Sequence, residues 1–250
     1  MIEAERTPWT DVAEHLGRTD APPASRLAVL PFGALEQHGP QLPLGTDTFQ
    51  AVHVARGIAL ALDAVLLPAV PYGDTWNNAG YPGTVSLSAS TVAAIALDIG
   101  RALAASPAPA SGLVVVNGDW GNRTPLYGAV RTLLQEGFPA IALDYPGLDA
   151  AAAAVRTTQS AAPGLNHADE LETSMMLAID DTLVHPERAV AVYPSFPGDF
   201  GTTPMQLHPF SPSGVFGDPT AATAETGHRL LDATVAGSLT VLTDFLARLD

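Results

Sequence analysis

Short, nearly all-apolar runs alternate along the chain with alanine-rich stretches. The runs are Leu27–Pro31, Ala64–Val70, Leu113–Val116 and Ala140–Asp144. Runs of this kind are typical of strands buried on both faces, as in parallel sheets covered by helices. The helical candidates are Thr48–Leu62, Ser90–Ala104, Pro125–Gln135, Asp169–Ile179 and Pro219–Leu249. This alternation predicts an α/β fold with a mostly parallel sheet flanked by α-helices.

The chain length and the placement of turn-forming residues predict one domain. A chain of 250 residues can bury one sizeable core, so we expect residues 1–250 to form a single domain. Residues 1–25 precede the first apolar run and are expected to be an N-terminal extension. Residues 194–217 are rich in proline and glycine, which predicts a long ordered loop with a functional or intersubunit role. In the last helix, Asp218 is expected to cap and Pro219 to take the first helical position.

The composition excludes several kinds of site. The chain has no cysteine, which excludes disulfides, thiolate metal sites and cysteine nucleophiles. All 11 basic residues are arginines, so Schiff-base chemistry and the lysine-containing phosphate loop are excluded as well. Any bound metal must therefore be held by His, Asp and Glu side chains.

The charge and hydropathy of the chain predict its surroundings. A formal net charge of -15 at pH 7 argues against nucleic acid and anionic membranes as partners, because both require clustered cations. No apolar run is long enough to predict a transmembrane helix. The N-terminus is charged and lacks the apolar stretch of a secretory signal. We therefore expect a cytoplasmic location.

Three metal-binding types of side chain follow the first apolar run. Glu36 and His38 lie two residues apart, so both point to the same side if the chain is extended there. Prolines and glycines beyond His38 can turn the chain so that Asp47, at the start of the next helix, returns to the pair. One Glu, one His and one Asp suit a divalent metal. The same spacing is equally compatible with a polar loop in which Asp47 or Thr46 caps a helix.

The helix expected at Asp169–Ile179 carries a carboxylate on its apolar face. Glu172 shares that face with Met175, Met176 and Ile179. Burying a carboxylate is costly unless it is paired or bound to a metal.

Other polar residues near these segments are less specific. Glu170 lies roughly opposite Glu172 and is expected to be a solvated charge. His167, at the helix entrance, can act as a general acid or base, although a lone histidine is more often structural. Asp119 follows the run Leu113–Val116 in a glycine-containing loop, where by itself a turn aspartate is the better interpretation.

Together these segments resemble the creatininase family of metal-dependent amidohydrolases. The block PFGALEQHGPQLPLGTD is similar to the family's most specific signature. Further blocks resemble those of the family in the same order: GYPGTVSLS, NGDWGN, HADELETS and GVFGDPTAATAETG. The resemblance extends from about Leu27 to the last helix. It implies a parallel sheet flanked by helices and a homohexameric assembly.

The resemblance also implies roles for individual residues. Glu36, His38 and Asp47 match metal ligands, with Asp47 a candidate bridge between two ions. Glu172 matches a residue that is a ligand in many members. His167 matches a histidine near the substrate to which proton transfer is assigned. The implied cofactor is one or two divalent ions of zinc, manganese or iron.

The chain departs from the family pattern at several positions. The usual NGHGGN reads NGDWGN, so Asp119 stands in place of a metal-binding histidine and Trp120 in place of a glycine. A carboxylate is a harder donor than imidazole and favours Mn²⁺, Fe²⁺ or Mg²⁺. A Glu–His pair common in nearer branches reads Asn77–Asn78, and Asp169 replaces the glycine of the HAG block. These departures imply a divergent substrate or a weakened metal site.

The resulting hypothesis is a metal-dependent amidohydrolase that cleaves the C–N bond of a small molecule, other than an ordinary peptide bond. A metal-activated water would attack the amide, with Glu36 and His167 as the catalytic residues. The metal ligands would be Glu36, His38, Asp47, Asp119 and Glu172.

Three further residues are expected to contact the substrate, namely Trp76, Asn78 and Trp120. The two tryptophans can wall a pocket, although ordinary core or interface aromatics are about as compatible with the sequence. Two alternatives remain open for the function. One is a peptidase that matures a modified peptide, and the other is a catalytically idle member that binds a ligand or serves as an assembly subunit.

Overall fold

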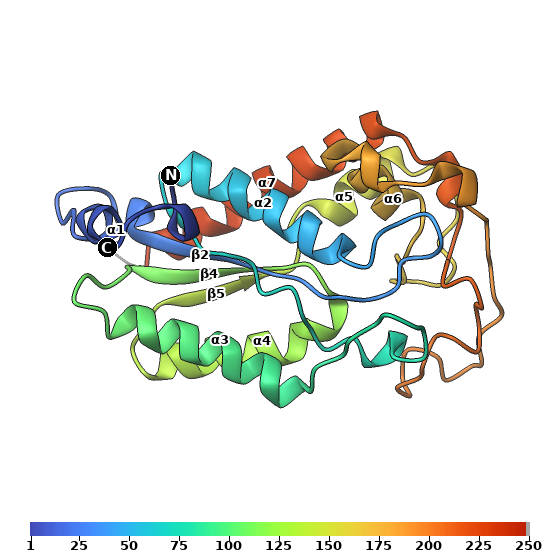
Figure 1. The fold of residues 1–250 in the computed structure, drawn as a ribbon, viewed down its shortest axis with the longest axis horizontal. Coiled ribbons are helices and arrows are strands. Elements are labelled where there is room, and N and C mark those ends of the chain that lie inside the picture. The colour runs from blue at the N-terminus through green and yellow to red at the C-terminus, as the bar shows by residue number, and fades with distance from the viewer. Residues whose placement is uncertain (249–250) are drawn as a thin grey trace.

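The computed structural model describes residues 1–248, which form one five-stranded parallel sheet with helices on both faces (Figure 1). The strands are β1 (Ile2–Glu3), β2 (Leu27–Phe32), β3 (Val65–Leu66), β4 (Gly112–Asn117) and β5 (Ala140–Leu143). They lie in the order β1-β3-β2-β4-β5, and every neighbouring pair is parallel. The predicted α/β class, with a parallel sheet flanked by helices, is confirmed.

The helices form two layers. They are α1 (Trp9–Leu16), α2 (Thr46–Leu62), α3 (Ala89–Ala104), α4 (Arg123–Gln135), α5 (Leu148–Val155), α6 (Glu170–Ile179) and α7 (Ala224–Leu246). Figure 1 shows α3 and α4 on one face of the sheet and α2, α5, α6 and α7 on the other. Short 3₁₀ turns occur at Ala4–Arg6, Pro23–Arg26, Trp76–Asn78, Trp120–Asn122, Asp181–Leu183, Pro186–Arg188 and Pro219–Ala221. None of the helices within residues 1–248 is long and apolar enough to cross a membrane.

Each layer of helices encloses its own apolar core. Successive side chains of a strand point to opposite faces of the sheet. Leu27 and Val29 of β2 therefore pack in the core beneath α2 and α7, whereas Ala28 and Leu30 pack in the core beneath α3 and α4. The side chains of β4 alternate in the same way, which explains why both strands read as continuous apolar runs.

Two predicted elements have different bounds in the structure. The expected strand Ala64–Val70 pairs as β3 only over Val65–Leu66, because Pro68 has no amide hydrogen to donate to the ladder. The last helix begins at Ala224 and is capped by Thr223, not by Asp218. Asp218 instead caps the short turn Pro219–Ala221, after which the backbone is extended again. The expected end of that helix at Leu249 lies outside the described residues.

Three elements carry no strong sequence signal and were not predicted. Residues 1–25 contain β1, which pairs with β3 at the edge of the sheet, and α1. A strand of two residues is too short to show a period. The alanine-rich helix α5 was also missed; its buried side chains are Ala152 and Val155.

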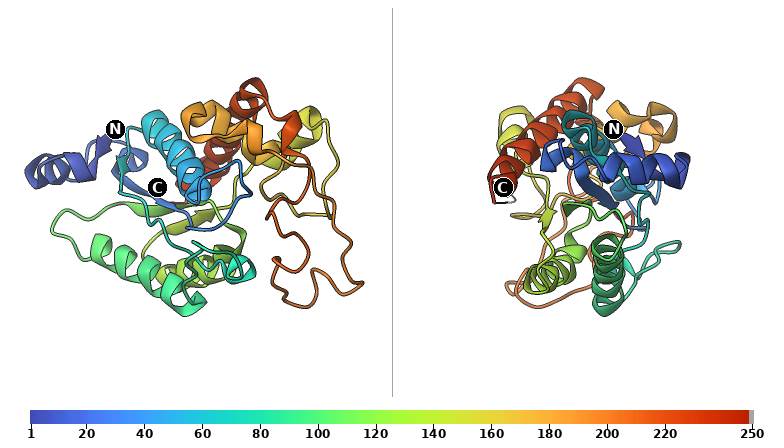
Figure 2. Two further views of the ribbon diagram at one scale, coloured as in Figure 1. Left: turned by 45° about the vertical axis from the view of Figure 1, so that its right-hand side comes forward. Right: turned by 90° about the vertical axis from the view of Figure 1, so that its left-hand side faces the viewer.

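Residues 194–217 contain no helix or strand, and Figure 2 shows them (orange) as a looped excursion at one end of the molecule. A small aromatic cluster lies within this segment. Phe196 stacks on Phe200 with ring centroids 3.9 Å apart and contacts Phe210 at 5.2 Å. Phe216 lies 6.2 Å from Phe196 and 6.0 Å from the ring of His167. The segment therefore packs against the region that carries the candidate site.

Candidate metal centre

The five predicted metal ligands come from segments that follow strands or begin helices. Glu36 and His38 follow β2, and Asp119 follows β4. Asp47 lies in the first turn of α2, and Glu172 in the first turn of α6. The carboxyl ends of the neighbouring parallel strands β2 and β4 meet at one edge of the sheet, which brings these segments together.

The side chains of these residues meet in one cluster. Nε2 of His38 lies 3.1 Å from Oδ1 of Asp47, 3.6 Å from Oε2 of Glu172 and 4.0 Å from Oε1 of Glu36. The ligand atoms of His38, Asp47 and Glu172 all lie within 4.8 Å of one another, as do those of Glu36, Asp47 and Asp119. Asp47 belongs to both groups, and Glu36 and His38 form a third group with His167. That the five bind metal stays a prediction.

Several buried polar atoms of the cluster have no hydrogen-bond partner within the described chain. They are Nε2 of His38, Oδ2 of Asp47 and Oδ2 of Asp119. Leaving a buried donor or acceptor unpaired costs about 1–3 kcal/mol, so three such atoms side by side call for a further partner. Imidazole nitrogen and carboxylate oxygen are the donors that divalent ions accept in proteins. The residues therefore fit a divalent metal site.

The electrostatics of the cluster favour the same partner. Burial raises the pKa of Glu172 to about 8 and that of Asp119 to about 7. Burial and the neighbouring charge of Asp119 raise the pKa of Glu36 and Asp47 well above their usual range. Carboxyls crowded in a poorly solvated site retain protons unless a cation is present to stabilise their ionised forms.

Backbone and amide contacts hold the ligands in place. Nδ1 of His38 lies 3.2 Å from the backbone oxygen of Glu36 and donates to it, which leaves Nε2 free to face the cluster. The side-chain amide of Asn78 donates to Oε2 of Glu36 at 3.0 Å. The backbone amide of Ala168 donates to Oε2 of Glu172 at 2.6 Å, and Ala168 adopts a φ of 52° that few non-glycine residues adopt.

His167 lies at the edge of the cluster. Its Nδ1 is 3.7 Å from Oε1 of Glu36, and its ring centroid is 4.5 Å from that of His38. Nε2 of His167 accepts a hydrogen bond from the side-chain amide of Gln37 at 2.7 Å, so the ring proton resides on Nδ1. Burial lowers the pKa of His167 well below its usual value. Gln37 was not predicted from the sequence, because a glutamine between two candidate ligands carries no distinguishing pattern.

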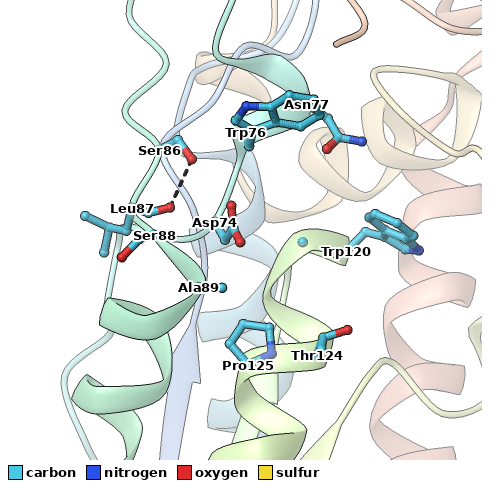
Figure 3. Close-up of a pocket in the computed structure, with 11 residues that line it drawn as sticks. Asp74, Trp76, Asn77, Ser86, Leu87, Ser88, Ala89, Trp120, Thr124 and Pro125 are labelled. Atoms are coloured by element: carbon cyan, nitrogen blue, oxygen red, sulfur yellow. Dashed lines mark hydrogen bonds between the residues drawn. The ribbon is translucent and has the colours of Figure 1, made fainter. Parts of the chain in front are cut away.

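The predicted substrate-contacting residues separate into two groups. Trp76 and Trp120 line a cavity of about 580 Å³ beside the cluster (Figure 3). Asn78 is only 4% exposed, and its amide bonds to Glu36 and Gln37. In the structure Asn78 therefore orients Glu36, and its contact with a substrate stays a prediction.

The sequence profile of the creatininase family, described as creatinine amidohydrolase, matches residues 5–242. The chain belongs to the creatininase family. The resemblance inferred from its sequence blocks is confirmed.

Relatives of the chain within the creatininase family carry different names. The mycofactocin precursor peptide peptidase of Mycobacterium ulcerans (strain Agy99) is 34% identical over 213 residues, covering 81% of this chain and 78% of the relative. The creatinine amidohydrolase of Pseudomonas putida is 28% identical over 233 residues, covering 84% of this chain and 85% of the relative. A crystal structure of creatinine amidohydrolase (creatininase) superposes with a TM-score of 0.83 at 25% identity, covering 97% of both chains.

One expectation for this creatininase-family chain is wrong. Glu170, expected to be solvated, is 1% exposed. Its carboxylate accepts hydrogen bonds from the backbone amides and hydroxyls of Thr157 and Thr158 at 2.7–3.1 Å. Burial raises the pKa of Glu170, but these hydrogen bonds outweigh it and leave the pKa below its usual value. Helical periodicity could not reveal that a segment distant from α6 covers this face.

The aspartate that stands in place of the family's HAG glycine has a definite position. Asp169 is fully buried and caps α6 by accepting hydrogen bonds from the amides of Leu171 and Glu172. Its other oxygen lies 3.0 Å from Nη1 of Arg156. The substitution is visible in the sequence, but the arginine partner of Asp169 was not predicted.

Proposed function

We propose that this creatininase-family chain is a metal-dependent hydrolase that cleaves the C–N bond of an amide. The observation that carries the proposal is a cluster of one imidazole, three buried carboxyls and the partly buried carboxyl of Glu172, with unpaired atoms at a sheet edge. Structures of relatives titled as a manganese creatininase and a creatininase of Zn-Zn type support a divalent ion at such a cluster.

One or two ions would be held by Glu36, His38, Asp47, Asp119 and Glu172. A bound ion would supply a water of lowered pKa and would polarise the amide carbonyl. Asp47, shared by the two ligand groups, is the candidate bridge between two ions. Asp119 provides a harder donor than imidazole, which favours Mn²⁺ or Fe²⁺ over Zn²⁺.

The residues beside the cluster suit proton transfer. Gln37 holds Nε2 of His167, so the proton on Nδ1 points toward Oε1 of Glu36 at 3.7 Å. Burial keeps the His167 ring neutral, and a neutral imidazole acts first as a base, so it can pass a proton on only after it has accepted one. In hydrolysis the hydroxyl of water joins the carbonyl carbon and its proton passes to the leaving nitrogen. Glu36 and His167 are the groups proposed to carry that proton.

Two substrate classes are candidates. A peptide is favoured by the identity of 34% to a precursor peptide peptidase, against 28% to a creatinine amidohydrolase. A small cyclic or acyclic amide is favoured by the superposition on creatininase over 97% of both chains. The Asn77–Asn78 and NGDWGN blocks depart from the family's usual pattern, which supports a divergent substrate.

The test uses the full chain loaded with Mn²⁺ or Zn²⁺. Cleavage of a mycofactocin precursor peptide and hydrolysis of creatinine and related cyclic amides are followed by mass spectrometry. Glu36→Gln is expected to abolish metal binding and turnover, whereas Glu225→Gln, an exposed position on α7, is expected to preserve both. Unchanged turnover in Glu36→Gln would refute the proposed centre. Absence of turnover on every amide by a fully metal-loaded chain would favour the idle, partner-binding alternative.

A further inference from the structure

A cavity of about 580 Å³ opens beside the metal centre, between the segment after β3 and the starts of α3 and α4. Figure 3 shows its lining residues, with Asp74 below Trp76 and to the left of Trp120. The cavity adjoins the cluster through the turn Trp120–Asn122, because Asp119 caps this turn by accepting a hydrogen bond from the Gly121 amide at 3.3 Å. The cavity therefore lies next to a predicted metal ligand.

Asp74 is the single charged residue among the residues that line this cavity. Within residues 1–248 its carboxylate forms neither an ion pair nor a hydrogen bond. Its backbone is held on both sides. The Asp74 amide donates to Oδ1 of Asn122 at 2.8 Å, and its carbonyl oxygen packs so closely on Gly121 that a Cβ there would overlap it. The fold thus fixes a carboxylate in the cavity and supplies no cation for it.

The two tryptophans complete a cation-binding environment. Trp76 is 44% exposed and Trp120 is 64% exposed, so a ligand in the cavity can reach both indoles. The faces of indole rings attract ammonium and guanidinium groups. Arg123 is the arginine nearest to Trp120 along the sequence. Its Nε lies 3.8 Å from Oδ1 of Asp144, and it does not line the cavity. The net charge of -15 also favours cationic over anionic ligands.

The starts of α3 and α4 border the cavity, and helix starts attract anions. At α3, however, Ser88 already caps the helix by accepting a hydrogen bond from the Thr91 amide. An anionic group in the cavity would also meet Asp74. The charge of the cavity therefore favours a cation.

We propose that this cavity binds a guanidinium or alkylammonium group of the molecule whose amide is cleaved, and that Asp74 selects for that positive charge. The identity of the molecule rests on the proposed hydrolase function. The preference of the cavity for a cation does not, because it can be measured in the metal-free chain without turnover.

The experiment measures binding through tryptophan fluorescence. A Trp9→Phe background removes the one tryptophan outside the cavity, which is 80% exposed on α1. N-acetyl-arginine amide and its neutral analogue N-acetyl-citrulline amide are titrated into this metal-free chain. We expect the arginine derivative to bind about tenfold more tightly, as an ion pair with aromatic contacts predicts. Asp74→Asn is expected to bring the two affinities together.

The control substitution is Asp149→Asn, an exposed aspartate on α5 outside the cavity, which is expected to preserve the preference. Equal binding of the two derivatives by the parent chain would overturn the proposal, as would a preference that survives Asp74→Asn. Tighter binding of N-acetyl-glutamate amide would assign the cavity to anions instead. Turnover without a charge preference would leave the hydrolase function standing, and a charge preference without turnover would refute only the hydrolase function.

Discussion

Asp119 is the residue in the centre that differs most in chemistry from its counterpart in the family's usual block. Its carboxyl lies beside those of Glu36 and Asp47, so all three candidate ligands of this group are carboxyls. An imidazole at this position would be neutral and softer. The substitution adds negative charge to a site that already raises the pKa of its carboxyls, which increases the demand for a cation.

Substituting Asp119→His is therefore expected to change metal preference. The imidazole should raise the ratio of bound Zn²⁺ to bound Mn²⁺ when the chain is refolded or dialysed against equal concentrations of both ions. Elemental analysis of the protein after desalting measures that ratio. An unchanged ratio would mean that Asp119 is not a ligand. Asp144→His, which lies after β5 and outside the cluster, is the matched control.

Single residues were predictable from the sequence where their chemistry conflicts with their surroundings. Glu172 was singled out because a carboxylate on an apolar helix face requires a partner, and the structure gives it a place beside His38. Gln37 and Arg156 were not, because a neutral amide or an arginine in a loop conflicts with nothing nearby in the sequence. Gln37 contacts His167, which is distant along the chain, and Arg156 contacts Asp169 across the loop between α5 and α6.

At the scale of elements, the start of α6 is held by contacts that secondary-structure patterns do not record. The end of α5 supplies Arg156 and the two threonines that follow it, and these bind Asp169 and Glu170. The main strands and the longer helices were predictable from their composition, whereas the short alanine-rich helix α5 was missed. The bounds of β3 and the start of α7 were not predictable. Pro68 interrupts the apolar run that contains β3, and the 3₁₀ turn Pro219–Ala221, which has its own cap, precedes α7.

The ion pair between Arg156 and Asp169 is expected to stabilise the junction of α5 and α6. Its side chains are 15% and 0% exposed, so Arg156→Met leaves a buried aspartate without its cation. Breaking a buried pair in this way costs about 3–5 kcal/mol. Urea unfolding followed by circular dichroism measures the loss. The double variant Arg156→Met, Asp169→Gly should recover most of the lost stability. Glycine in place of aspartate at a helix N-cap costs only about a few tenths of a kcal/mol.

A loss of stability in Arg156→Met that the second substitution does not restore would contradict this account. It would indicate that Arg156 acts through Asn166, whose side-chain oxygen it also contacts at 2.6 Å. Arg101→Met serves as the comparison. Its partner Glu136 lies on the surface, and exposed pairs contribute only about 0–1 kcal/mol.

At the scale of the whole molecule, the buried acidic cluster couples folding, pH and metal binding. The folded chain raises the pKa of Asp119 to about 7 and that of Glu172 to about 8, by burial in both cases. In the unfolded chain these carboxyls titrate near their ordinary values of about 4. The folded state therefore binds protons more tightly, and the protonated groups stabilise it at low pH. That contribution is lost as the pH rises from about 4 through 8, because the unfolded state then gains by ionising.

A bound divalent ion should reverse this trend, since it binds the ionised carboxylates and competes with protons. We expect the melting temperature of the metal-free chain to fall between pH 5 and pH 8, and the increase on adding Mn²⁺ to grow over the same range. Thermal unfolding in chelator and in Mn²⁺ measures both. The net charge of -15 could produce a similar fall by general repulsion, but that repulsion is screened by added salt. A metal-induced increase that is the same at pH 5 and pH 8 in high salt would show that the ions bind elsewhere.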